Sequence, residues 1–478
     1  MTTLAVVGLD MGSTNIKVLV ATQGGEELFV LSTPSPWTTG ESGHTEMGAA
    51  DVTASVLEIL QQAGVRLREL PGEHRVTAIG VSGMAEAGVL IGGDGSAAAP
   101  IIAWFDPRGE QEILATPDAF RAEFAGRTGL PVGPIATIAK LLHLKGTGVG
   151  LTDKRWLNLP EYVAYILGGR PATEHSLASR TGLLDQDTGR PWPAALDILG
   201  VGDDFLPEPC SAGDAIGHVG HPMLSDIFRG ATVTIAGHDH LVSAVAAGAM
   251  SSTQLYNSMG TAEAIIRILD TQLSFEARER LAVGGINALR HVIPGKYVLL
   301  AATKAGLLMR RVFQMLGISD AAGRDTIDAA TLALPVHGML IDGISVTGAR
   351  NDDGVLRVRV NSDGASPAEL FTATLLHGND MCAELIEVMN REVPAATSSL
   401  LTGGWAGMSS VVRARQLVLP RVSKSAHSED TAFGAALFAA YAATETEVHE
   451  HEEATDAFIR FAAAFCAVGA HSTEGICQ

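Results

Sequence analysis

The chain has 478 residues, enough for two to four domains that each bury a core, which excludes a single small binding module. Hydrophobic residues make up 46% of it and charged residues 18%, so it is neither disordered nor fibrous. Its formal net charge of −20 would repel nucleic-acid phosphates and anionic lipid headgroups, so we expect no nucleic-acid partner and no membrane partner.

The start of the chain and its cysteines indicate a cytoplasmic protein. The N-terminus has no basic region, and Asp10 interrupts its first apolar run, so we expect neither a signal peptide nor an anchor. No segment reaches the roughly 18 uninterrupted apolar residues of a membrane helix. The sequence holds 4 cysteines without CxxC spacing, too few for a disulfide scaffold of this size.

The first half begins with a strand, a turn and a second strand. Residues 4–9 and 16–21 are apolar and β-branched, and the polar, glycine-bearing residues 10–15 between them predict a hairpin. Residues 51–63 carry apolar side chains at helical spacing, and residues 76–81 predict a further strand. This order predicts an α/β layer architecture.

A similar pattern starts again in the middle of the chain. Residues 232–236 predict a strand, and residues 255–258 and 262–269 predict two strands around another glycine turn. Long helical patterns follow, at residues 303–316, 367–391 and 431–444. Because the halves begin alike, we expect two related domains, 1–247 and 248–478, around a central cleft where a ligand binds.

The turn of the first hairpin has the composition of a phosphate-binding loop. Its candidate residues are Asp10, Gly12, Ser13, Thr14 and Lys17. Such a turn points backbone N–H groups and hydroxyls at an anion, while Asp10 can hold the metal or water that accompanies a phosphate. A plain hairpin built from turn-forming residues is the alternative.

Two more glycine turns follow predicted strands in the second half. They contain Gly260 with Thr261, and Gly403 with Gly404. Three such turns over two similar halves favour a nucleotide cleft, although one alone is weak. The sequence contains neither the GxxxxGK[ST] motif nor a GxGxxG motif after a strand, so we expect neither a P-loop nor a dinucleotide-binding fold.

Residues 237–240, Gly-His-Asp-His, follow the strand at 232–236, where α/β proteins place reacting groups. Asp239 could accept a proton from a substrate hydroxyl, and His238 and His240 could orient it or the substrate. A metal site of these side chains is a second interpretation. A third is that Asp239 simply caps the following helix, which does not exclude catalysis.

A further polar group lies near strand ends in the first half. It comprises Glu86, Trp104, Asp106 and Arg108. Carboxylates and a guanidinium match vicinal hydroxyls, and an indole covers a C–H face, so the group suits a polyhydroxylated ligand. The alternative is a buried tryptophan beside a surface salt bridge.

Together, these motifs resemble the FGGY family of carbohydrate kinases, which belongs to the actin-like, ribonuclease-H-like ATPase superfamily. The resemblance extends from Val6 to Tyr441, and the motifs occur in the family's order. They are residues 10–17, 104–108, 174–189, 237–240, 259–261, 403–404 and 429–436.

The resemblance implies two actin-like domains, with the sugar and phosphate side in 1–247 and the nucleotide side in 248–478. It implies an ATP-dependent kinase that transfers the γ-phosphate to a hydroxyl of a ketopentose (xylulose-like, for example), a ketohexose or a polyol. Asp239 would be the general base, and Asp10 and Asp239 would hold Mg²⁺. The implied sugar ligands are Glu86, Trp104, Asp106, Arg108 and His240. The implied nucleotide and phosphate ligands are Gly12, Ser13, Thr14, Lys17, Gly260, Thr261, Gly403 and Gly404.

The chain also departs from the family's pattern. Ala85-Glu86 stands where many members have Gln-His or Arg-Glu, and residues 348–351 are the nearest remnant of the G-E-R-x-P segment. Residues 405–410 lack the usual Lys-Ser and tryptophan of the adenosine signature. The identity of the sugar is therefore open. A sugar-sensing protein without catalysis and an actin-like phosphohydrolase are the alternative functions. A homodimer is expected only because it is the common oligomeric state of proteins.

Overall fold

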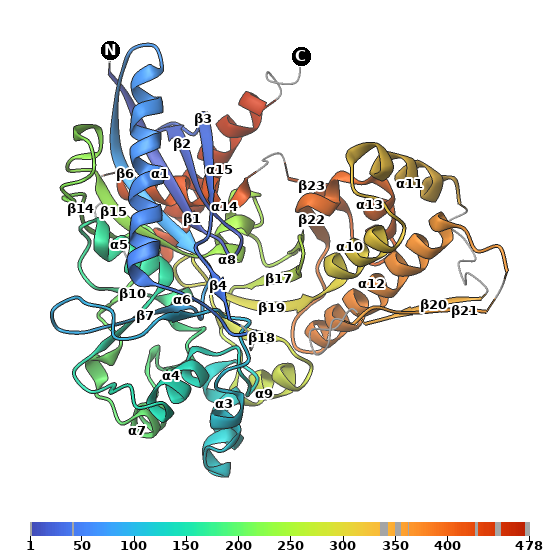
Figure 1. The fold of residues 1–478 in the computed structure, drawn as a ribbon, viewed down its shortest axis with the longest axis horizontal. Helices are drawn as coiled ribbons and strands as arrows, with labels where there is room; N and C mark the ends of the chain where they lie inside the picture. The colour runs from blue at the N-terminus through green and yellow to red at the C-terminus, as the bar shows by residue number, and fades with distance from the viewer. Residues whose placement is uncertain are drawn as a thin grey trace.

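A computed structural model describes residues 2–40, 43–334, 343–348, 355–361, 363–425, 429–444 and 451–473. The chain forms two lobes, each built on a six-stranded mixed sheet with helices against it (Figure 1). The α/β class expected from the sequence is therefore confirmed. Of the family motifs, the remnant at 348–351 lies mostly outside the described residues.

The sheet of the first lobe has the strand order β14-β15-β6-β1-β2-β3. Its strands are β1 (Thr2–Met11), β2 (Asn15–Thr22), β3 (Glu27–Pro34), β6 (Glu73–Gly83), β14 (Ala215–His218) and β15 (Thr232–His238). Strands β1, β6 and β15 run parallel, whereas β2, β3 and β14 are antiparallel to their neighbours. The predicted hairpin and the strands at 76–81 and 232–236 are confirmed, each slightly longer than predicted.

Helices cover both faces of this sheet. They are α1 (Ala49–Glu69), α5 (Leu159–Leu167), α8 (Asp239–Ala246) and α14 (Asp430–Ala442). Along β1, Val6 joins the apolar cluster that contains α8 and α14, while Val7 and Leu9 join the cluster that contains α1 and α5. This alternation is the period of two of a strand that is buried on both faces.

Helix α14, far along the chain, completes the first lobe. A Cβ atom on Gly8 of β1 would lie 1.9 Å from the Ala432 carbonyl oxygen, and one on Gly80 of β6 would lie 2.2 Å from that of Ala435. The helix backbone therefore rests directly on these strands, which only glycine permits.

The second sheet has the order β18-β19-β17-β16-β22-β23. Its strands are β16 (Gln254–Met259), β17 (Glu263–Leu269), β18 (Asn287–Arg290), β19 (Tyr297–Thr303), β22 (Ser398–Thr402) and β23 (Val422–Lys424). Strands β16, β22 and β23 run parallel to one another, whereas β17 is antiparallel to both of its neighbours, β16 and β19. This sheet therefore repeats the pattern of the first. Its helices are α9 (Phe275–Val283), α10 (Ala305–Met315), α11 (Ala321–Ala333), α12 (Pro367–Asn390) and α13 (Ser409–Arg415).

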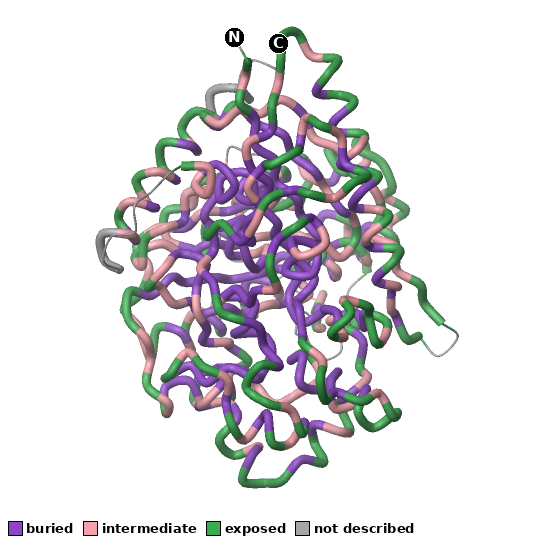
Figure 2. The backbone as a smooth tube through the Cα atoms, turned by 90° about the vertical axis from the view of Figure 1, so that its left-hand side faces the viewer, coloured by how far each residue is buried: buried purple, intermediate pink, exposed green. Residues whose placement is uncertain are grey.

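One apolar cluster connects the two sheets through α8. It contains Val242 of α8, Phe438 of α14, and Tyr256 and Ile266 of the second sheet. The Tyr256 hydroxyl also lies 2.5 Å from the Ser243 hydroxyl of α8. The buried residues accordingly run through the centre of the molecule (Figure 2).

Smaller elements complete the lobes. In the first lobe they are β4 (Thr38–Thr39), β5 (Thr45–Met47), β7 (Gly88–Ile91), β8 (Ile101–Ile102), β9 (Arg155–Asn158), β10 (Thr173–Glu174), β11 (Leu184–Asp185), β12 (Arg190–Pro191), β13 (Pro209–Cys210), α2 (Glu110–Leu114), α3 (Asp118–Thr128), α4 (Thr137–Gly146), α6 (His175–Ala178) and α7 (Pro193–Leu199). In the second they are β20 (Ile344–Thr347), β21 (Arg357–Val360) and the 3-10 turn η3 (Gly404–Gly407), and α15 (His451–Thr473) follows α14. None of the helices that the structure describes is both long and apolar enough to cross a membrane.

Candidate active site

The parallel strands of the first sheet bring two predicted site residues together. Asp10 of β1 lies opposite Ser82 of β6, and Ser82 lies opposite Gly237 of β15. The carboxyl ends of adjacent parallel strands share one edge of the sheet, so Asp10 and Asp239 converge there. Their carboxyl groups are close enough that Asp239 raises the pKa of Asp10.

The Asp10 side chain fits a cation-binding role. It is buried, and its Oδ1 has no hydrogen-bond partner within the described chain. Burial, and secondly the charge of Asp239, raises its pKa to about 8. Mg²⁺ usually binds one or two carboxylates plus water and substrate phosphates, so these two aspartates fit it. The described residues hold no group of three or more His, Cys, Asp or Glu side chains suited to a metal, so the metal site of His238, Asp239 and His240 has no support.

Two tryptophans hold the turn between β1 and β2, the first candidate phosphate loop. The Trp37 indole N–H donates to the Ser13 carbonyl oxygen at 2.8 Å, and the Trp104 indole N–H donates to the Ser13 hydroxyl oxygen at 2.9 Å. The Ser35 hydroxyl donates to the Gly12 carbonyl oxygen at 2.6 Å. Thr14, at the tip, is exposed. The loop is thus fixed from one side and accessible at its tip, which a plain hairpin turn would not require.

Asp239 is the first residue of α8 and stays ionised. Its Oδ1 accepts the His240 backbone N–H at 2.6 Å and lies 3.3 Å from His238 Nε2. Burial alone would raise its pKa, but His240, His238 and this N–H group outweigh burial and lower it. Its side chain keeps 21% exposure, so a substrate can reach it. The N-cap residue of α8 is His238, so the interpretation of Asp239 as a helix cap is wrong.

The segment before α6 supports the turn that carries Asp239. Ser176 Oγ accepts the His238 backbone N–H at 3.0 Å and donates to Glu174 Oε2 at 2.5 Å. Gly237 has φ +105°, and a Cβ there would lie 2.8 Å from Ser176 Oγ, so only glycine suits this position. Burial lowers the pKa of His238 to about 3, which keeps its ring neutral.

Three of the predicted sugar ligands are engaged in two separate ion pairs. Glu86, directly after β6, is buried and forms an ion pair with Arg180, which follows α6. Asp106 instead pairs with Arg108 at 2.9 Å and accepts the Thr45 backbone N–H at 2.7 Å. Burial would raise the pKa of Asp106, but its hydrogen bonds from Arg108 and Thr45 lower it to about 2.

The hydrogen-bonding groups of Asp106 and Arg108 are therefore largely occupied by other groups of the protein. Arg108 also donates to Glu46 at 2.7 Å. The pair fixes the loop that carries Trp104, whose side chain is half-buried. Asp106 is itself buried, so the alternative of a surface salt bridge is wrong.

The second sheet presents the remaining phosphate motifs at one edge. Ser258 of β16 lies opposite Thr402 of the parallel strand β22, so the turns after both strands are neighbours. Gly403 has φ +89°, and a Cβ there would lie 2.5 Å from the Met259 carbonyl oxygen. This glycine allows the two turns that carry Gly260 and Gly403 to approach closely.

The beginning of α14 contacts the candidate phosphate motifs of both sheets. Glu429, its N-cap, forms an ion pair with Lys17 of the first sheet. Asp430 is hydrogen-bonded to Thr402 of the second sheet, and burial raises its pKa to about 6. Glu429, Asp430 and Arg180 lie in the family motifs 429–436 and 174–189, but sequence patterns assigned them no individual roles, because their partners lie far away in the chain.

Comparison with known proteins identifies the class of protein. A sequence profile of the N-terminal domain of the FGGY family of carbohydrate kinases matches residues 5–246. The chain belongs to this family, whose members transfer phosphate to an alcohol group. It is 24% identical over 479 residues to the xylulose kinase of Bacillus subtilis (strain 168), covering 96% of this chain and 92% of that protein. It is 23% identical over 270 residues to the gluconokinase of the same organism, covering 55% and 52%.

Solved structures confirm the two-domain fold of the family. A structure described as a xyloylose kinase from Brucella ovis has a TM-score of 0.80 at 18% identity, covering 97% of this chain and 98% of that one. Glycerol kinase from Plasmodium falciparum with ADP has a TM-score of 0.81 at 14% identity, covering 96% and 92%. At such identities the likeness is one of fold.

Proposed function

We propose that the protein transfers the γ-phosphate of ATP to a hydroxyl of a sugar or polyol, with Asp239 as the general base. The observation that carries this proposal is the convergence of Asp10 and Asp239 at one sheet edge, the first buried with an unpartnered oxygen and the second ionised and accessible. An ionised carboxylate at a strand end can take the hydroxyl proton as that oxygen attacks phosphorus.

The phosphate side consists of backbone and hydroxyl donors at the two sheet edges. Gly12, Ser13 and Thr14 would present donors from the first lobe, and Gly260 and Thr261 from the second. Lys17 would contribute positive charge there, although it is shared with Glu429. Bound Mg²⁺, held by Asp10 and Asp239, would neutralise charge that develops on the phosphates.

The nucleotide would lie against the second lobe. Gly403 and Gly404 allow its close approach, since a Cβ on Gly404 would meet no atom within 4 Å. In this proposal the domains are 1–247 and 248–478, with α14 returning to the first sheet. Closure of the two lobes would exclude water, which would otherwise accept the phosphate.

The acceptor would bind on the first lobe beside Asp239. His240 lies close enough to Asp239 to lower its pKa, and Asp239 lies close enough to Glu86 to raise the pKa of Glu86. Trp104 would cover one face of the sugar, positioned by the pair of Asp106 with Arg108. A ketopentose, a ketohexose or a linear polyol fits this set of side chains.

Release of ADP by the purified protein with Mg·ATP, across ketoses, aldoses, aldonates and polyols, tests the proposal. The proposal predicts turnover that depends on one of these acceptors. Equal turnover in the control without acceptor would favour the phosphohydrolase alternative. No turnover, with a ligand-induced shift of melting temperature retained, would favour the sensor alternative.

A further inference from the structure

We propose that Glu86 and Arg180 bind neighbouring hydroxyls of the acceptor and make the site select an uncharged sugar or polyol over a sugar acid. This inference rests on the proposed kinase function and names its substrate class. Glu86 was expected in the site from the sequence, whereas Arg180 is assigned from the structure alone.

The geometry of the pair leaves one donor and one acceptor free. Nε and Nη2 of Arg180 both contact Oε1 of Glu86, and the two side chains are 8% and 5% exposed. Nη1 of Arg180 is buried and has no hydrogen-bond partner in the described chain, and Oε2 of Glu86 takes no part in the ion pair. A buried polar group without a partner is rare, so a ligand that supplies the missing hydrogen bond to Nη1 accounts for it.

The pair lies next to the proposed base. Gly83 of β6 lies opposite His238 of β15, so Glu86 and Asp239, which follow these strand ends, lie at the same edge of the sheet, where Arg180 contacts Glu86. An acceptor whose reacting hydroxyl faces Asp239 would therefore place an adjacent hydroxyl at Glu86 and Arg180. A single hydroxyl can accept a hydrogen bond from Nη1 and donate one to Oε2. Two adjacent hydroxyls can divide these two hydrogen bonds between them, which relaxes the geometry that each must meet.

The backbone at Glu86 supports a functional role. It has φ +64°, which is uncommon for a residue other than glycine. Its carbonyl oxygen accepts the Thr137 hydroxyl at 3.2 Å, which helps to hold this conformation. Strained conformations of this kind are concentrated at ligand-binding positions.

The charges around the pair disfavour a carboxylate ligand. Arg180 is already neutralised by Glu86, and Arg108 by Asp106 and Glu46. The Lys140 ammonium group donates to backbone carbonyl oxygens, those of Asp106 and Arg108.

His240 is the remaining basic side chain that could pair with a carboxylate ligand, but it already interacts with carboxylates of the protein. It acts on Glu86 and on Asp239, so a carboxylate placed beside it would be repelled by both. Desolvating such a ligand without a free cation is costly. The site therefore favours a neutral acceptor.

Binding and turnover by the wild-type protein separate this inference from the kinase proposal. Calorimetry and ADP release would compare D-xylulose, D-fructose and D-glucitol with D-gluconate. We expect a neutral compound to bind at least about tenfold more tightly than D-gluconate. Preference for D-gluconate would overturn the inference but leave the kinase proposal intact. Binding of a neutral compound without turnover would overturn only the kinase proposal, and binding of none of them would overturn the inference.

The Glu86→Gln variant tests the charge argument. It leaves Arg180 without its counter-charge, so kcat/KM for D-gluconate relative to the neutral acceptor should rise at least about tenfold. A ratio equal to that of the wild type would contradict the role of Glu86 in selecting charge.

The Arg180→Lys variant tests the hydrogen bonds. It keeps the charge but removes the planar fork, so KM for the neutral acceptor should rise about 10- to 100-fold while kcat changes less. Arg267→Lys is a matched control, because Arg267 is equally buried but donates to carbonyl oxygens of Ser252 and Pro394 in the second lobe. Both variants should lower the melting temperature. Unchanged KM in Arg180→Lys, or an equal rise in Arg267→Lys, would overturn the assignment.

Discussion

At the residue scale, the site depends on buried carboxyl groups whose pKa values shift in opposite directions, because different neighbours surround them. Asp239 keeps a low pKa because histidines and a backbone N–H group surround it, whereas burial raises the pKa of Glu174 to about 7. Glu174 does not face the reactants. It holds Ser176, which in turn holds the backbone of His238, so its protonation bears on the stability of the catalytic turn.

The raised pKa of Glu174 predicts a dependence of stability on pH. The folded state binds the proton up to about pH 7, but the unfolded state releases it near 4.5, so this contribution to stability is complete below pH 4.5 and is lost as the pH rises to 7. The loss is about 3 kcal/mol. Glu174→Gln should remove it, so urea unfolding at pH 5 and pH 8 should differ less than in the wild type. Glu69→Gln, on the exposed face of α1, is the control and should leave the pH dependence of stability as in the wild type. The same unchanged pH dependence in Glu174→Gln would contradict this account.

At the element scale, helix α14 determines how the site is assembled. It rests on β1 and β6 through Gly8 and Gly80, and its first residues contact Lys17 and Thr402 on the two sheets. Displacing α14 would therefore separate the phosphate motifs that it connects.

A substitution at Gly8 tests this packing. Gly8→Ala would place a methyl group 1.9 Å from the Ala432 carbonyl oxygen, so the free energy of unfolding in urea should fall by about 2 kcal/mol or more. Gly24→Ala is the control, since its Cβ would meet only the Thr22 hydroxyl at 3.8 Å. Equal stability of the two variants would show that α14 does not pack against β1 as described.

These elements also show what the sequence could predict. Runs of apolar, β-branched residues predicted β1 and β2, because a strand's composition is local, and glycine turns at strand ends marked Asp10, Gly260 and Gly403 as candidate site residues. The position of α14 depends on contacts across more than 400 positions, between Gly8 and Ala432, and no local pattern encodes them. For the same reason the motif at 174–189 did not predict the pairing of Arg180 with Glu86, since only folding brings the two together.

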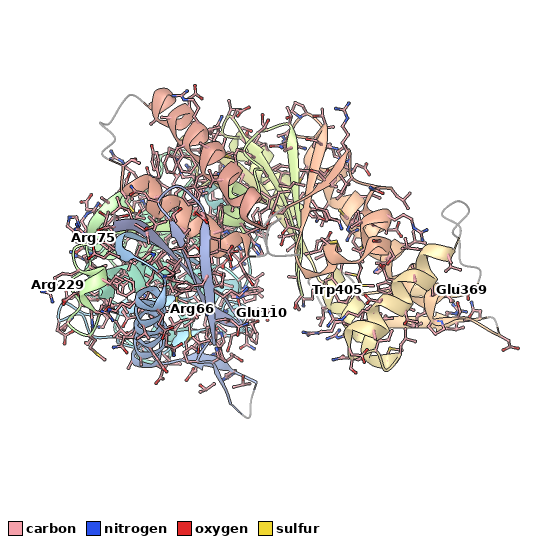
Figure 3. The ribbon with its side chains drawn as sticks, turned by 90° about the horizontal axis from the view of Figure 1, so that it is seen from above. Arg66, Arg75, Glu110, Arg229, Glu369 and Trp405 are labelled. Atoms are coloured by element: carbon pink, nitrogen blue, oxygen red, sulfur yellow. The ribbon has the colours of Figure 1, made fainter. Side chains whose placement is uncertain are left out.

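At the scale of the whole molecule, the lobes are joined by a continuous core around α8 and by polar contacts elsewhere. Arg278 of α9 donates to the Gly126 carbonyl oxygen at 2.6 Å and to Asp187 at 2.7 Å, both in the first lobe. Seen from above, Trp405 of the smaller lobe lies on the side towards Glu110 of the larger one (Figure 3). The two lobes therefore face each other across this side of the molecule.

This arrangement predicts closure when both substrates bind. A non-hydrolysable ATP analogue together with a neutral acceptor should decrease the radius of gyration in small-angle X-ray scattering. The reason is that the nucleotide would bind one lobe and the acceptor the other, and both would meet at the phosphates between them. Either ligand alone should have a smaller effect. An unchanged radius with both ligands bound, as verified by calorimetry, would contradict closure.

The central claim is that Asp239 accepts the proton from the attacking hydroxyl. The most direct measurement compares Asp239→Asn with the wild type in acceptor-dependent ADP release and in acceptor binding by calorimetry. We predict that kcat falls by about 10²- to 10⁴-fold while the dissociation constant for the acceptor changes by less than about tenfold, because asparagine keeps the shape and the oxygen but cannot take the proton. Turnover equal to that of the wild type would contradict the claim.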